Sequence, residues 1–211
     1  MIEAYAATLV GVALAQASPG PNMLAVAGAA LGSGRRAALW TVGGVACGML
    51  VWAAAVAFGL GAVLALYPTL LTGMKIVGGA YLAWLAFKGL RAAFRGGAPT
   101  VRADARARGP LGAWRRGLLV VLTNPKALLM WSAVGTYLFG SGLTAGQVLG
   151  FGPVGAVSAL LIYGGYGLLF STGAAAGVYR RFTRPIEAGM GVAFGALGGR
   201  LILDGARELR T

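Results

Sequence analysis

The stretch that decides the fold is residues 38–66, ALWTVGGVACGMLVWAAAVAFGLGAVLAL, which carries no charged side chain. It lies within a charge-free run from Ala37 to Met74, and a second such run extends from Ala127 to Tyr179. A helix needs about 20 apolar residues to cross the hydrocarbon core of a bilayer. The first run therefore holds one crossing and a turn, and the second holds most of two. Lipid rather than water is the main solvent of this chain.

The composition limits the function classes. Of the 211 residues 58% are hydrophobic and 11% are charged, whereas soluble domains carry about 25% charged residues. The chain has one cysteine, Cys47, no histidine and five carboxylates. This set excludes an intrachain disulfide and offers neither a metal site nor an acid–base pair for an intramembrane enzyme. We expect a protein without cofactor, metal or enzymatic activity.

An all-α membrane protein with six spans fits the apolar segments. A single transmembrane domain, 1–211, would comprise a first half (1–94), a basic connector (95–111) and a second half (112–211). The apolar start lacks the basic region of a cleaved signal peptide, so we interpret it as a retained span. We place the spans at residues 2–31, 38–66, 69–93, 112–138, 147–173 and 185–205.

The basic residues indicate the orientation. Thirteen of them lie on one side of the predicted membrane, in the loop after span one, the connector with its flanks, and the loop after span five; three lie at the C-terminal end. The positive-inside rule places the connector in the cytoplasm and both termini outside. The net charge of +13 thus reflects membrane topology, and we expect no nucleic-acid partner. Three spans per half also imply an inverted repeat, which is common in secondary transporters.

Two proline motifs interrupt spans one and four. Proline breaks a helix interior but is favoured at the first position of a new helix, and Ser18 and Asn124 are suitable caps. At about 1.5 Å per residue, both breaks lie roughly 14–16 Å from the inner face, near the middle of the membrane. The positive ends of two half-helices would then converge on an anionic group such as a carboxylate. The alternative is that the prolines only kink two packed helices. The motifs are Ser18-Pro19-Gly20-Pro21-Asn22 and Thr123-Asn124-Pro125-Lys126.

Charged residues inside the spans are functional candidates because they are costly in lipid. We expect Lys126 to bind a substrate carboxylate or to pair with an acid. Lys75 is a second substrate-binding candidate, with snorkelling to the outer headgroups as the alternative. Arg200 and Asp204 are spaced for an i,i+4 ion pair, with gating by Arg200 as the alternative. Glu187 and Asp204 are the candidate proton relays, although both also suit a helix interface.

Glycine pairs within the spans predict close helix contacts. They are Gly43-Gly44, Gly78-Gly79, Gly164-Gly165 and Gly198-Gly199, together with Gly48.

The ordered motifs resemble the LysE/RhtB family of amino-acid exporters over nearly the whole chain. They are SPGPNML (18–24), GSGRR (32–36), GGVACG (43–48), KIVGGAYL (75–82), WRRGLL (114–119), NPKALL (124–129) and GALGGRL (195–201). Two departures concern Met49, where many members have an acidic or polar residue, and Thr136-Tyr137, near which many have a Pro-Gln pair.

The resemblance implies export across the bacterial plasma membrane, by proton antiport, with residues 19–22 and 124–126 as functional positions. We therefore expect a secondary transporter for an amino acid or a similar metabolite. The alternatives are an exporter of another small solute and a non-transporting structural or assembly subunit. The expected partners are the lipid bilayer and a small-molecule substrate, and a homodimer stays open.

Overall fold

The computed structural model describes residues 1–67, 69–95, 101–103, 109–172 and 175–209, and these residues are helical, without strands. The all-α fold is therefore confirmed for this part of the chain. Pro68 and the connector residues Asp104, Arg106 and Arg108 lie outside it. The elements are α1 (Ile2–Ala17), α2 (Pro21–Ala54), a π-helical segment η1 (Ala55–Leu60), α3 (Gly61–Leu66), α4 (Leu70–Arg95), α5 (Gly109–Leu122), α6 (Pro125–Gly140), α7 (Ala145–Phe170) and α8 (Ala175–Glu208).

Several helices have the length and apolar composition of membrane spans. Among the described residues there are four such stretches, Pro21–Leu66, Leu70–Arg95, Ala145–Phe170 and Arg184–Glu208. The pair α5 and α6 adds a fifth if it is one broken span, because the two helices are bent by 60°. The predicted span 2–31 corresponds to α1 with the start of α2, and the total of six spans stays a prediction.

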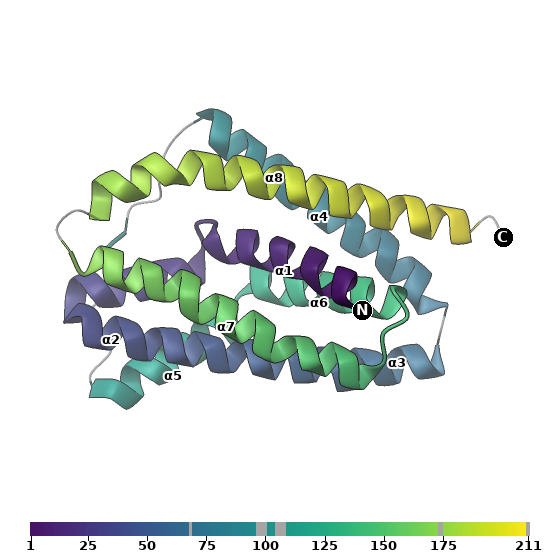
Figure 1. The fold of residues 1–211 in the computed structure, drawn as a ribbon, viewed down its shortest axis with the longest axis horizontal. Coiled ribbons are helices and arrows are strands. Elements are labelled where there is room, and N and C mark those ends of the chain that lie inside the picture. Colours follow the sequence, from purple (N-terminus) through teal and green to yellow (C-terminus); the bar gives the residue numbers. More distant parts are fainter. Residues whose placement is uncertain (68, 96–100, 104–108, 173–174, 210–211) are drawn as a thin grey trace.

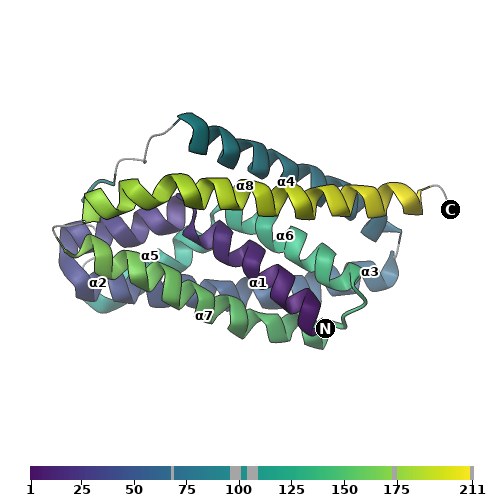
Figure 2. The ribbon, with the colours of Figure 1, turned by 45° about the horizontal axis from the view of Figure 1, so that its top comes forward.

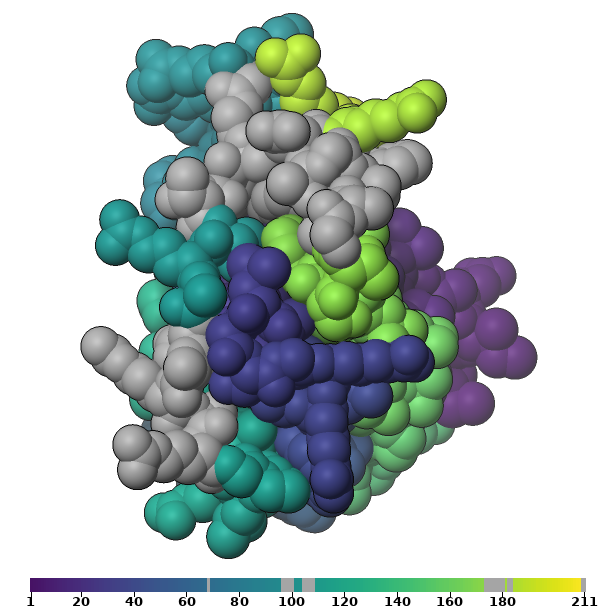
Figure 3. All heavy atoms as spheres, turned by 90° about the vertical axis from the view of Figure 1, so that its left-hand side faces the viewer, coloured from purple at the N-terminus to yellow at the C-terminus, as the bar shows by residue number. Residues whose placement is uncertain are grey.

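The boundary between predicted spans one and two differs from the expected loop at 32–37. The helix continues through these residues and is interrupted only at Gly34, where φ is 80° and ψ is 179°. Such angles are accessible essentially to glycine alone, so one residue redirects the chain where a polar loop was expected. Figure 3 looks onto this end of the molecule, where the segment around Gly34 (dark blue) lies beside the start of α5 (teal).

The helices form three layers. Figures 1 and 2 show α1 and α6 between the pair α4–α8 on one side and the group α2, α5 and α7 on the other. The exterior remains apolar, with side chains such as Phe58, Phe87 and Leu161 at least 60% exposed. An exterior of this kind suits lipid contact rather than water.

Glycines bring the helix backbones into contact within these layers. A Cβ on Gly117 of α5 would lie 2.0 Å from the Thr41 carbonyl oxygen of α2. A Cβ on Gly79 of α4 would lie 2.7 Å from the Gly198 oxygen of α8. Small residues are how membrane helices associate without a hydrophobic driving force. The predicted contacts are confirmed for Gly44, Gly48, Gly79 and Gly198, whereas Gly164, Gly165 and Gly199 face open space.

Candidate substrate site

The first break separates α1 from α2. Pro21 is the first residue of α2, and Gly20, with extended backbone, precedes it as the N-cap. The expectation that Ser18 caps this helix is wrong. Ser18 instead ends α1, and its hydroxyl donates to the Ala15 carbonyl oxygen at 3.0 Å. No side chain in the described part of the chain caps the N-terminus of α2.

The second break separates α5 from α6 and is closed by its own cap. Asn124 is the N-cap, as predicted, and its Oδ1 accepts a hydrogen bond from the Lys126 backbone N–H at 3.0 Å. Its carbonyl oxygen accepts from the N–H groups of Ala127 and Leu128, at 3.0 and 3.1 Å. The two helix starts therefore differ, because α6 is satisfied internally and α2 is left open toward its surroundings.

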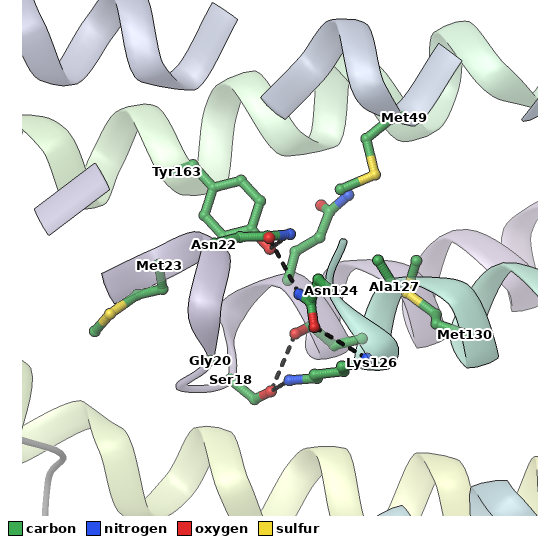
Figure 4. Close-up of a pocket in the computed structure, with 12 residues that line it drawn as sticks. Ser18, Gly20, Asn22, Met23, Met49, Asn124, Lys126, Ala127, Met130 and Tyr163 are labelled. Atoms are coloured by element: carbon green, nitrogen blue, oxygen red, sulfur yellow. Dashed lines mark hydrogen bonds between the residues drawn. The ribbon is translucent and has the colours of Figure 1, made fainter. Parts of the chain in front are cut away.

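The two breaks meet, as the sequence predicted. The Asn124 side-chain amide donates to Asn22 Oδ1 at 3.1 Å, and the Asn22 amide donates to the Tyr163 hydroxyl at 3.4 Å. The Lys126 ammonium crosses from α6 to donate to the Ser18 hydroxyl. Figure 4 shows these side chains, from both breaks and from α7, around one small space. Thr123 lies outside it, exposed and bonded to the Leu119 oxygen at 2.7 Å.

The space at the breaks is a cavity of about 20 Å³. This volume holds roughly one water molecule, so an organic substrate requires the cavity to widen. The polar residues of the lining are Gln16, Ser18, Gly20, Asn22, Asn124, Lys126 and Tyr163, and the apolar ones are Ala15, Met23, Met49, Ala127 and Met130.

Positive charge gathers at the open start of α2. The Lys126 ammonium nitrogen lies 3.7 Å from where a Cβ on Gly20 would stand. Gly20 is the N-cap of α2, and an uncapped helix N-terminus carries about half a positive charge on its free N–H groups. An ammonium group beside such a helix start is stabilised by an anion that neutralises both. The chemistry that this arrangement favours is the binding of a carboxylate-sized anion.

A buried acid from α8 faces this charge. Glu187 is 8% exposed and close enough to Lys126 and Lys88 to interact electrostatically with both. A buried carboxylate needs such partners because lipid and protein solvate it poorly. Of the two acids proposed as proton relays, Glu187 thus lies near the site.

The remaining charged candidates lie away from the cavity. Asp204 forms the predicted ion pair with Arg200, at 3.9 Å, and both side chains are exposed on the surface of the bundle. Lys75 is buried on α4, but its ammonium group is bound by Glu208 at the end of α8. The structure therefore does not bring Lys75 to the breaks, and this residue joins α4 to α8 instead.

Sequence reasoning missed part of the lining. Gln16 is 1% exposed, donates to the Gly155 oxygen at 3.1 Å and accepts from the Ser158 hydroxyl at 2.7 Å. An amide within an apolar span was a signal for it. The methionines Met23 and Met130 gave no signal, because methionine is ordinary in any apolar helix.

Comparison with known proteins supplies an independent line of inference. The family model described as LysE type translocator matches residues 13–205. The threonine efflux protein of Salmonella typhi is 28% identical, with 89% of this chain and 91% of that protein covered. The threonine efflux protein of Escherichia coli K12 is also 28% identical, with the same coverage. The membrane protein YahN of E. coli K12 is 29% identical over 90% of this chain and 85% of its own length. No solved structure is significantly similar.

Proposed function

This chain belongs to the LysE type translocator family, and from that premise we propose that it exports an amino acid from the cytoplasm in exchange for protons. Members of this family are transporters, so the protein is a membrane transporter rather than an enzyme. The similarity to threonine efflux proteins over nine-tenths of their length supports an amino acid or a closely similar solute as cargo.

One observation carries the proposal. The Lys126 ammonium stands at the uncapped N-terminus of α2, and this combination matches the carboxylate that every amino acid has. In the structure the Lys126 ammonium donates to the Ser18 hydroxyl. We infer that the substrate carboxylate takes the place of the Ser18 hydroxyl as the partner of Lys126 and accepts hydrogen bonds from the open N–H groups of α2.

Glu187 is our candidate for the coupling proton. An amino acid carries an ammonium group as well as a carboxylate, and Glu187, close to Lys126, is the acid that could pair with that ammonium group. The coupling proton and the substrate ammonium would then compete for the Glu187 carboxylate. Deprotonation of Glu187 would favour substrate binding, and protonation would favour release of the substrate. Competition of this kind links proton and substrate in opposite directions, as an antiporter requires.

The orientation that we propose has both termini outside the bacterial inner membrane and the connector in the cytoplasm. The start of α1 and the end of α8 both lie toward the right-hand end of the molecule in Figures 1 and 2, which supports an even number of spans. The unequal distribution of lysine and arginine supports the direction.

The test is transport by purified protein in liposomes, with a panel of labelled amino acids and a pH gradient of either sign. In the wild type, we expect the direction of net amino-acid transport to reverse when the sign of the pH gradient is reversed. Glu187→Gln should retain exchange of labelled for unlabelled substrate but lose the response to the gradient, whereas Glu187→Asp should keep part of it. A gradient response that survives in Glu187→Gln contradicts the assignment of the proton to Glu187.

A further inference from the structure

A second cavity lies directly behind the substrate site. It has a volume of about 30 Å³ and is lined by α1, α4, α6 and α8, through Val12, Leu82, Val134, Phe194, Leu197 and Leu201 among others. Two hydroxyl-bearing side chains, Thr8 and Tyr137, belong to its lining, and the Thr8 hydroxyl is bonded to the Ala4 oxygen at 2.6 Å. The surface that the lining presents to the cavity is apolar.

Met130 separates the two cavities. It lines both the space at the breaks and the apolar cavity, and it is 5% exposed. It lies on α6 four residues after Lys126, so both side chains are on the same face of that helix, one turn apart. A methionine side chain is unbranched and has three rotatable bonds, so it adapts its shape more readily than the valine, leucine and phenylalanine side chains around the second cavity.

The site at the breaks can widen on the side of Met130 without loss of a hydrogen bond. Its polar lining is tied together by Asn22, Asn124 and Tyr163, and Gln16 is held by Gly155 and Ser158. Met49 is also fixed, since its sulfur accepts from the Trp131 ring N–H at 3.4 Å. Movement of Met130 needs no hydrogen bond to break and would join the two cavities into one, cationic at one end and apolar at the other.

We propose that the substrate is an amino acid with an uncharged, apolar side chain of about the size of leucine or methionine, and that Met130 selects it by yielding to that side chain. This inference rests on the proposed function, because it takes Lys126 as the partner of the carboxylate. The side chain then occupies the cavity behind Met130.

The chemistry of the cavity disfavours the other side chains. A hydroxyl, as in threonine, meets apolar surface there and loses the hydrogen bonds that it had in water. A lysine side chain meets no carboxylate in the described lining of either cavity, and Lys126 repels it. A second carboxylate finds no second cation among the described lining residues of the two cavities. We therefore expect leucine and methionine to be transported at least about tenfold faster than threonine, lysine or glutamate at equal low concentration.

The experiment compares these amino acids, with phenylalanine and alanine added, in liposomes containing wild type, Met130→Ala, Met130→Phe and Met130→Leu. Met130→Ala should raise the rate for phenylalanine relative to leucine by about tenfold. Met130→Phe should fill the cavity and raise the rate for alanine relative to leucine. Met130→Leu, of similar volume, is the control and should keep the wild-type order.

The outcomes separate this inference from the proposed function. Threonine or lysine transported faster than leucine by the wild type, or an unchanged order of substrates in Met130→Ala and Met130→Phe, overturns the inference and leaves the exporter in place. If Met130→Phe does not fold, the ratio in Met130→Ala decides alone. No transport of any amino acid by the folded wild type overturns the exporter proposal as well.

Discussion

Replacement of Lys126 by methionine tests the anion site most directly. The substitution keeps an unbranched side chain of similar length and removes the ammonium that stands at the start of α2. This ammonium donates to the neutral Ser18 hydroxyl, and it is attracted to the buried Glu187 carboxylate, which keeps Lys88 as a cationic partner in the variant. A charge in mid-membrane costs at least about 2.5 kcal/mol, so its removal should leave the free energy of unfolding unchanged or raise it. Folding and insertion are therefore preserved, and a loss of transport reports on the site.

The size of the effect follows from the interaction that is lost. A hydrogen bond to a charged group contributes about 1.5–3 kcal/mol, and each 1.4 kcal/mol corresponds to a tenfold change in affinity. We therefore expect transport at low substrate concentration to fall by about 12- to 150-fold in Lys126→Met. Lys126→Arg keeps the charge and is the matched control, expected to retain more activity than Lys126→Met although its planar group fits a different geometry.

The assay is initial-rate transport in liposomes with equal amounts of inserted protein, paired with a thermal unfolding measurement in detergent. The expected pattern is a melting temperature at or above that of the wild type together with the loss of transport. Wild-type rates in Lys126→Met would refute the anion site, and a lower melting temperature would show that Lys126 stabilises the fold instead.

Three further substitutions test how the structure holds the site. Asn124→Ala removes the cap of α6 and the hydrogen-bond donor to Asn22. We expect about 1–2 kcal/mol of destabilisation, measured by thermal unfolding. Thr123→Ala is the nearly neutral control. Gly117→Ala places a methyl group 2.0 Å from the Thr41 oxygen and should destabilise the fold by about 3 kcal/mol or prevent folding. The control Gly146→Ala adds a methyl group in open space and should be tolerated. Equal yields of folded protein from the two variants would contradict the α2–α5 contact. Glu208→Gln removes the charged partner of buried Lys75. Because the Glu208 side chain is 42% exposed, the free energy of unfolding should fall by only about 1 kcal/mol. The control Thr72→Val removes the hydrogen bond of 2.9 Å to Glu208 and should cost no more than this.

The sequence by itself determined the membrane class, the two broken helices and the cap at Asn124. These features follow from the local properties of the chain: long runs without charge cannot be solvated by water, and proline cannot continue a helix. The sequence also predicted that the two breaks meet, because breaks at matched depth in antiparallel halves lie at the same level of the membrane. The i,i+4 pair of Arg200 and Asp204 was local as well.

The tertiary structure alone decided which residues surround the site. Lys75 and Lys126 look equivalent as buried lysines, but α8 brings Glu208 to the first and Glu187 toward the second. Whether a helix start is open depends on which side chain reaches it, and Ser18, a suitable cap by type, bonds backward to Ala15 and leaves α2 uncapped. The position of Met130 between two cavities depends on four helices packing together. Which side chains of distant segments reach the site depends on the packing of all the helices, and the local patterns of the sequence do not specify it.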